Sequence, residues 1–143
     1  VHHTICVPYA VLSAGLALEV CEALGMTTAE MRDRLMDFAV DVYGLTRVMD
    51  RDFGARHVAS QLFRASSSVA ANYRATALAR SSAEFVAKLG TVREEADEVV
   101  FWMEFMQRAA LVSDDARLRR MRGEAGEIVA MVSAAYRTSK ARY

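Results

Sequence analysis

The sequence predicts an all-α protein, an antiparallel up-down-up-down four-helix bundle with an extra N-terminal segment. Three observations support this prediction. The 143 residues include one proline and seven glycines, so long stretches contain no helix breaker. Beyond residue 26, apolar residues recur at steps of three and four, which is the spacing of one helix face. Capping signals divide this region into four segments with short links, and short links make consecutive helices antiparallel.

Composition places the chain among globular proteins with one domain, since 53% of the residues are hydrophobic and 25% are charged. The formal net charge is zero, which excludes the strong global field that drives non-specific binding to nucleic acid or anionic membranes. The apolar run from Val11 to Val20 is shorter than the roughly 20 residues of a membrane-spanning helix. No Lys or Arg precedes this run, as a secretory signal would require. We therefore predict a cytoplasmic protein without a membrane partner.

The N-terminal extension, residues 1–26, differs in composition from the rest of the chain. It contains both cysteines, Cys6 and Cys21, and no Lys or Arg. The bundle itself, residues 27–143, therefore has no cysteine for a disulfide or a zinc site. Two interpretations of the extension are open. Either Met26 is the true start and the preceding residues have no role in the fold, or residues 11–24 form a short helix that docks on the bundle.

The first predicted helix covers residues 28–49. Thr27-Thr28-Ala29-Glu30 has the pattern of a capping box, in which the Thr hydroxyl and the Glu carboxylate each accept a backbone N–H. Asp50-Arg51-Asp52 and Gly54 mark its end. Its inward stripe consists of Met31, Leu35, Phe38, Val42, Leu45 and Met49.

The second predicted helix covers residues 55–80, and the small residues within Gln61–Arg74 suit close helix contact. No Asp or Glu occurs from residue 54 to residue 83, so its outward face is basic, and Arg56, Arg64 and Arg74 are the candidate nucleic-acid-binding residues. We expect Asn72, at the edge of the apolar face, to form a hydrogen bond with a neighbouring helix, since a buried amide must be satisfied. The inward face consists of Val58, Leu62, Ala65, Val69, Asn72, Tyr73 and Thr76.

The third predicted helix covers residues 83–111 and follows a second capping-box pattern, Ser81-Ser82-Ala83-Glu84. Phe101, Trp102 and Phe105 lie in a different sector from the inward stripe, so this helix is apolar around most of its girth. We predict that these three residues form a subunit interface; the alternative is that they widen the edge of the core. The stripe itself consists of Phe85, Leu89, Val92, Ala96, Val99, Met103 and Met106.

The fourth predicted helix extends to about residue 138. Ser113, followed by two aspartates, is its predicted cap, because negative charge is favoured at a helix N-terminus. The basic tail, residues 137–143, is expected to fray. We interpret four arginines of the helix as a solvent-exposed face and not as a ligand site: Arg117, Arg119, Arg120 and Arg122. Its inward stripe consists of Leu118, Met121, Ala125, Ile128, Val132 and Ala135.

The residue pattern does not support catalysis. Beyond the extension the chain has one histidine, His57, on the polar side of the second helix, and a nucleophile needs a base within hydrogen-bond reach. A di-metal site in a bundle uses Glu-x-x-His pairs, and the sequence contains none. We predict no catalytic, metal-binding or cofactor-binding residues and no small-molecule substrate. An acidic cluster on the third helix is expected to pair with arginines of a neighbouring helix or subunit: Glu94, Glu95, Asp97 and Glu98.

Three motifs together resemble a known family. They are the small-residue run Gln61–Arg74, the turn and helix start Arg80–Gly90, and the acidic and aromatic stretch Glu94–Glu104. Over about residues 30–140 the chain resembles the bacterial four-helix-bundle family linked to 23S rRNA intervening sequences. The resemblance implies a small bundle, a homopentamer, with no known enzymatic activity. It also implies a likeness to accessory subunits of diversity-generating retroelements, in which a basic ring engages nucleic acid and a reverse transcriptase.

This chain departs from that basic character, because its charges balance. The function predicted first is therefore a non-catalytic oligomeric interaction module. The alternative is a nucleic-acid-binding adaptor, such as an accessory subunit working with a reverse transcriptase, that uses the three arginines of the second helix. Repetition of these arginines around an oligomer would add avidity to a weak patch.

Overall fold

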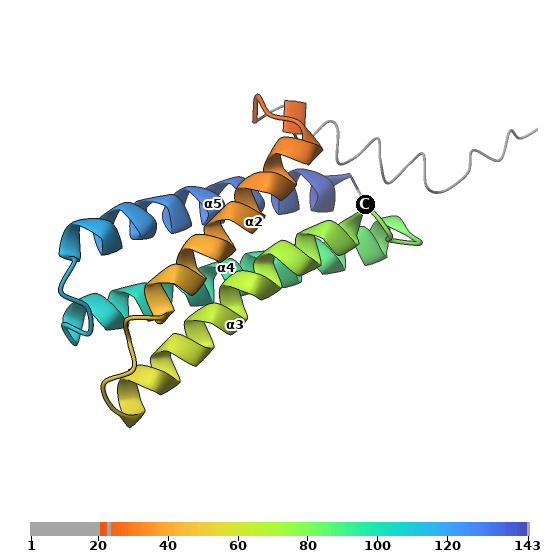
Figure 1. The fold of residues 1–143 in the computed structure, drawn as a ribbon. Coiled ribbons are helices and arrows are strands. Elements are labelled where there is room, and N and C mark those ends of the chain that lie inside the picture. The colour runs from red at the N-terminus through yellow and green to blue at the C-terminus, as the bar shows by residue number, and fades with distance from the viewer. Residues whose placement is uncertain (1–20, 23, 143) are drawn as a thin grey trace, which may run out of the picture.

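Four helices follow one another along the part of the chain that the computed structural model describes, residues 21, 22 and 24–142. They are α2 (Thr28–Thr46), α3 (Phe53–Thr76), α4 (Ser82–Arg108) and α5 (Asp115–Ala141). Each helix packs against the next in the chain, whereas α2 contacts α5 much less extensively (Figure 1). The predicted all-α up-down bundle is confirmed. Residues 1–20 of the predicted N-terminal segment lie outside the described residues.

The first two helices begin with the side-chain caps that their sequences encode. At α2, Glu30 N–H donates to Thr27 Oγ1 (3.1 Å) and Thr27 N–H donates to Glu30 Oε2 (2.6 Å), so the predicted capping box is confirmed. At α3, Ala55 N–H donates to Asp52 Oδ1 (2.8 Å). Asp52 was predicted to mark the end of the previous helix, and the structure shows that it is also the N-cap of α3. As a result α3 begins two residues before the predicted position.

The caps of the last two helices agree only in part with the predictions. Ser81 caps α4 by accepting from Glu84 N–H (3.0 Å), but the Glu84 carboxylate accepts from Arg80 N–H (2.8 Å), one residue before the cap. The cap of α5 is Asp114, whose Oδ1 accepts from the N–H of the residue three further on (2.9 Å), so the prediction of Ser113 was wrong. A carboxylate in this place also interacts favourably with the helix dipole.

The helix ends differ from the predictions because apolar periodicity continues beyond the helical hydrogen bonds. Met49 and Ala79 are 0% and 5% exposed although they lie after the ends of α2 and α3. A buried residue in a turn therefore looks like part of the stripe. At the other end of the chain, α5 continues to Ala141 and its last turn contains the fully buried Ser139, so the predicted fraying from residue 137 was wrong.

The four predicted stripes form the core. Every stripe residue is buried except Asn72, which is half-buried. The expectation that Asn72 bonds to a neighbouring helix was wrong, because its Nδ2 donates to the carbonyl (3.0 Å) and the hydroxyl (2.9 Å) of Ser68 in its own helix. A hydroxyl one turn earlier satisfies the amide locally.

The described residues before α2 also contact the core. Cys21 is 2% exposed, and its Sγ lies 3.6 Å from the hydroxyl of Tyr73 in α3. Burial raises the pKa of the Tyr73 hydroxyl, and the contact with Cys21 adds to this effect. Leu24 packs against the core, and the chain then turns at Gly25, whose φ of 67° suits a residue without a Cβ.

Candidate interaction surface

Five ring side chains form an aromatic cluster where the start of α3 lies beside the end of α4. Its phenylalanines are well exposed, at 78% for Phe53, 55% for Phe101 and 45% for Phe105. His57 is also exposed, and Trp102 is half-buried against the core. We call these five residues the aromatic cluster. The three residues predicted as a subunit interface are all members.

Trp102 lies at the centre of the aromatic cluster. Its ring meets those of Phe101, Phe105 and His57 edge-on, with centroid distances of 4.9, 6.0 and 6.0 Å. His57 in turn stacks on Phe53 at 6.4 Å. Edge-to-face contacts of this kind are favoured by the quadrupoles of the rings. The rings thus form one connected, outward-facing surface.

The topology explains why two of the five members were not predicted. Phe101, Trp102 and Phe105 are close in sequence and share one sector of α4. Phe53 and His57 lie four residues apart, so they are neighbours on α3. Antiparallel packing of α3 on α4 brings the two groups together. His57 was predicted to lie on a polar face, and its contact with Trp102 depends on helix packing that periodicity does not reveal.

An ion-pair network lies next to the aromatic cluster. Arg64 of α3 contacts two carboxylates of α4, with distances of 3.1 Å to Glu95 and 2.5 Å to Glu98. The indole N–H of Trp102 donates to the same Glu98 oxygen at 3.1 Å. The hydrogen bond from Arg64 lowers the pKa of Glu98, and the bond from Trp102 adds a smaller effect in the same direction. The hydrogen bond to Glu98 in turn raises the pKa of Arg64. The predicted pairing of the acidic cluster with a neighbouring helix is confirmed for Glu95 and Glu98.

A second apolar surface is formed by residues of α2 and α3. Met36, Val40 and Tyr43 are 50%, 58% and 53% exposed and follow i, i+4, i+7 spacing along α2. Phe63 of α3 is 42% exposed, and its ring lies 5.7 Å from that of Tyr43. We call these four residues the α2–α3 face. An open groove of about 270 Å³ adjoins it, lined in part by Met49 and by small residues of α3.

The α2–α3 face was not predicted, although the sequence contains a pattern that indicates it. The spacing of Met36, Val40 and Tyr43 is itself a helical stripe, offset from the inward stripe of the same helix. A helix with two apolar stripes has more apolar surface than a single core contact needs. Phe63 is exposed because its neighbour Leu62 points into the core, which places Phe63 on a different side of the helix.

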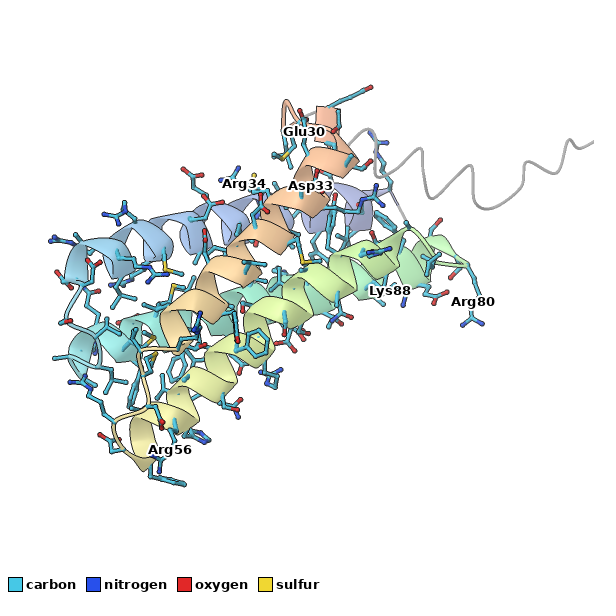
Figure 2. All side chains as sticks on the ribbon, viewed as in Figure 1. Glu30, Asp33, Arg34, Arg56, Arg80 and Lys88 are labelled. Carbon is cyan, nitrogen blue, oxygen red and sulfur yellow. The ribbon has the colours of Figure 1, made fainter. Side chains whose placement is uncertain are left out.

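The three candidate nucleic-acid-binding arginines are exposed along α3, but the structure does not bring them together. Figure 2 shows Arg56 at the start of α3 with its side chain directed outward. Its guanidinium lies 3.4 Å from Asp50, while Arg64 is held by the two glutamates of α4. Arg74 lies near the other end of α3, about 27 Å from Arg56 at 1.5 Å per residue. They form a spaced row.

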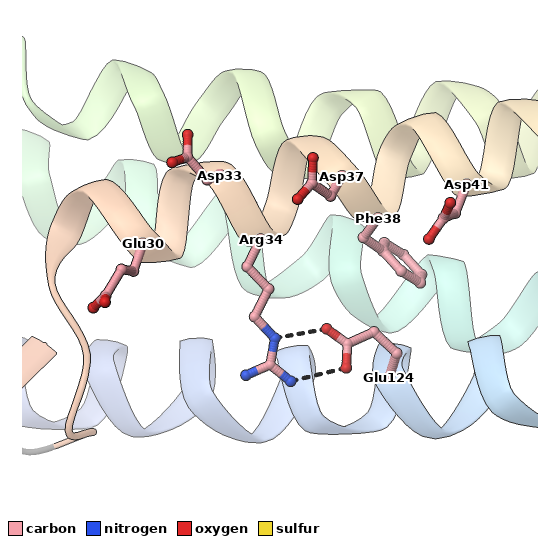
Figure 3. A pocket seen from close by; sticks show the side chains of 7 residues that line it. All are labelled: Glu30, Asp33, Arg34, Asp37, Phe38, Asp41 and Glu124. Carbon is pink, nitrogen blue, oxygen red and sulfur yellow. Dashed lines mark hydrogen bonds and ion pairs between the residues drawn. The ribbon is translucent and has the colours of Figure 1, made fainter.

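A pocket between α2 and α5 is occupied by an ion pair and offers no catalytic group among the described side chains that line it. An open pocket of about 370 Å³ lies along the groove between α2 and α5, and Figure 3 shows Arg34 extending across it to Glu124.

Among the described residues no group of three or more His, Cys, Asp or Glu side chains could hold a metal ion. None of the helices in the described part of the chain is both long and apolar enough to cross a membrane.

The fold and its surfaces define a small helical bundle that displays connected aromatic side chains on its outside. Residues 27–134 match the model of the 23S rRNA-intervening sequence protein family, and the chain belongs to this family. The family predicted from the sequence motifs is thus confirmed.

A crystal structure at 1.70 Å resolution provides a comparison for the fold. It shows a protein with unknown function from the S23 ribosomal protein family of Bacteroides thetaiotaomicron VPI-5482. The two chains share 23% sequence identity and superpose with a TM-score of 0.70, over 77% of this chain and 97% of the other. This likeness concerns the fold. No curated protein matches the chain significantly.

Proposed function

We propose that this protein is a non-catalytic interaction module that binds further copies of itself through the aromatic cluster. One observation carries the proposal: Phe53, Phe101 and Phe105 are all about half exposed or more, within one network of ring contacts. Single exposed apolar residues are normal on a monomer, but a connected patch of large rings marks an interaction site. Aromatic residues are also enriched at the centres of protein interfaces.

Burying the exposed half of one phenylalanine removes on the order of 100 Å² of apolar surface from water and contributes about 2.5 kcal/mol. Three such side chains offset a large part of the entropy lost on association. The edge-to-face contacts around Trp102 hold the rings in place before binding, so little further ordering is needed.

The α2–α3 face supports assembly into a ring. It consists of residues of α2 and α3 and shares no residue with the aromatic cluster, so one copy has two different apolar surfaces. Contact between the aromatic cluster of one copy and the α2–α3 face of the next is heterologous, and repeated heterologous contacts close into a ring when the rotation permits. The homopentamer expected from the family resemblance is an assembly of this type.

Light scattering coupled to size exclusion tests the proposal. We expect the wild-type protein to have a multiple of the chain mass, five-fold for the pentamer, and F101E/F105E to be a monomer because the charges oppose burial. Leu78→Glu is the matched control: Leu78 is 78% exposed but belongs to neither surface, so this variant should assemble like the wild type. A monomeric wild-type protein at physiological salt would contradict the proposal.

We propose binding of RNA or DNA through Arg56, Arg64 and Arg74 as the alternative function, with a reverse transcriptase as the protein partner that the resemblance implies. The exposure of all three arginines supports it. Two of them already contact carboxylates, so phosphate binding would have to replace those pairs. For this reason the geometry supports self-assembly better.

The salt dependence of binding tests the alternative. If phosphate contacts matter, affinity for RNA or DNA should fall steeply with salt, and replacing the three arginines with Ala should flatten this dependence. Undetectable binding at low salt, or affinity unchanged in the triple variant, would rule out a role for these residues.

A further inference from the structure

We propose that Arg64 is a positioning residue for assembly, which acts through Glu98 to hold the indole of Trp102 in the orientation that the aromatic cluster presents to a second copy. This inference rests on the proposed function and assigns Arg64 a task inside the protein. Trp102 contacts the other rings of the aromatic cluster, and Arg64 is linked to it by two hydrogen bonds that share the Glu98 carboxylate.

The geometry points to this role because two donors converge on one atom. Glu98 Oε1 lies 2.5 Å from Arg64 Nη2 and 3.1 Å from Trp102 Nε1. Glu98 precedes Trp102 by four residues, so the carboxylate and the indole are neighbours on one face of α4. Arg64 comes from the adjacent helix, and its second contact, to Glu95, holds the guanidinium about one turn earlier in α4.

The hydrogen bond between Trp102 and Glu98 matters for the whole aromatic cluster, because Trp102 lies at its centre. The indole contacts three of the other four members, so its rotation would separate the rings of α4 from those of α3. Without Arg64, Glu98 loses its charged partner, and the carboxylate is free to leave the indole for water. An interface that must first order such a side chain binds more weakly, by about three- to tenfold for one immobilised residue.

This assignment separates Arg64 from the other two candidate arginines of α3. Arg56 has one long contact to an exposed aspartate, and Arg74 is exposed with no ion pair among the described residues. Arg74 is therefore a matched control for Arg64: it is an exposed arginine on the same helix, without a link to the aromatic cluster.

The test uses the fact that Trp102 is the single tryptophan of the chain, so its fluorescence reports on one indole. We expect R64A and E98A to shift the emission of Trp102, to increase its quenching by acrylamide, and to weaken self-association by about three- to tenfold. R64K should recover part of both signals, and R74A should change neither. Circular dichroism would confirm that each variant is folded at the temperature used.

A double-mutant cycle with W102F gives the second arm, measured by sedimentation. If Arg64 acts through Trp102, R64A should weaken association of the wild type but add no further loss to W102F. Losses that simply add in R64A/W102F, or a loss in R64A with unchanged Trp102 emission, would overturn the inference. A monomeric wild-type protein would instead refute self-assembly, and the fluorescence of R64A would still decide whether Arg64 positions Trp102.

Discussion

The guanidinium of Arg34 in α2 binds both oxygens of the Glu124 carboxylate in α5, with Nε–Oε1 and Nη2–Oε2 distances of 2.6 and 2.8 Å (Figure 3). Glu127 accepts a further hydrogen bond from Arg34. The pair joins the two neighbouring helices that contact each other least, and an open pocket lies beside it. A bidentate arginine–carboxylate pair is both directional and strong. This contact therefore helps to hold α2 and α5 together where few side chains of the two helices pack against each other.

We expect R34M and E124Q each to lower the free energy of unfolding by about 1 to 2 kcal/mol, because both side chains are roughly two-thirds buried. R34M leaves the Glu124 carboxylate without its charged partner, and E124Q leaves Arg34 with only the more exposed Glu127 as an ion-pair partner among the described residues. Urea denaturation gives the values, and a double-mutant cycle gives the coupling. The exposed pair of Arg119 and Asp115 is the control, with an expected coupling of about 0.3 to 0.5 kcal/mol. Equal couplings in the two cycles would show that the ion pair of Arg34 and Glu124 has no special role.

The same pair predicts a pH dependence. The hydrogen bond from Arg34 lowers the pKa of Glu124 below its ordinary value of 4.5. A lowered pKa in the folded state means that the stabilisation is present above the pKa of the unfolded chain and is lost as pH falls through the folded value. The stability difference between wild type and E124Q should therefore be constant from pH 7 to about pH 5 and shrink at lower pH. A difference that grows on acidification would contradict this assignment.

The contrast between the stripes and this ion pair shows what the sequence could predict. Each inward stripe is a local pattern, so the core of all four helices followed from periodicity. Arg34 and Glu124 are 90 residues apart, and their meeting depends on the relative position of two helices, which local patterns do not encode. The aromatic cluster lies between these cases: Phe101, Trp102 and Phe105 could be predicted from one helix, whereas Phe53 and His57 required the packing of two.

The C-terminus of α4 shows a second limit of the sequence and gives a prediction. Ala110 has a φ of 49°, and the bonds Leu111 N–H to Met106 O (3.1 Å) and Ala110 N–H to Gln107 O (3.3 Å) form a Schellman motif. This place usually holds glycine, and its absence explains why the helix was predicted to run to residue 111.

We expect A110G to raise the free energy of unfolding by about 1 kcal/mol, because glycine adopts the left-handed conformation without the Cβ penalty. Thermal and urea denaturation measure the change. Ala109→Gly is the control: Ala109 has a φ of −84°, so glycine should bring no gain there. Destabilisation by A110G equal to that of the control would show that the backbone at residue 110 is not strained.

Ser139 gives a prediction about buried polarity. It is 0% exposed, and its hydroxyl has no hydrogen-bond partner among the described residues. An unsatisfied buried hydroxyl is destabilising, so S139A should raise stability by about 1 kcal/mol. Ser66 is a matched control, since it is equally buried but donates to Phe63 O at 3.1 Å. Both changes bring the same gain in helix propensity, so a larger benefit at Ser139 isolates the missing hydrogen bond, and an equal benefit would refute it.

The contact between Cys21 and Tyr73 predicts that residues before Met26 stabilise the bundle. Cys21 is 2% exposed, and Leu24 packs against the core. A chain that begins at Met26 loses both side chains and uncovers Tyr73, so we expect it to be less stable than a chain that begins at Cys21 by about 2 to 3 kcal/mol. Urea denaturation followed by circular dichroism makes the comparison. Cys21→Ala in the longer chain should show only part of the loss, because Leu24 remains. Identical midpoints for the two chains would favour the interpretation in which the residues before Met26 have no role in the fold.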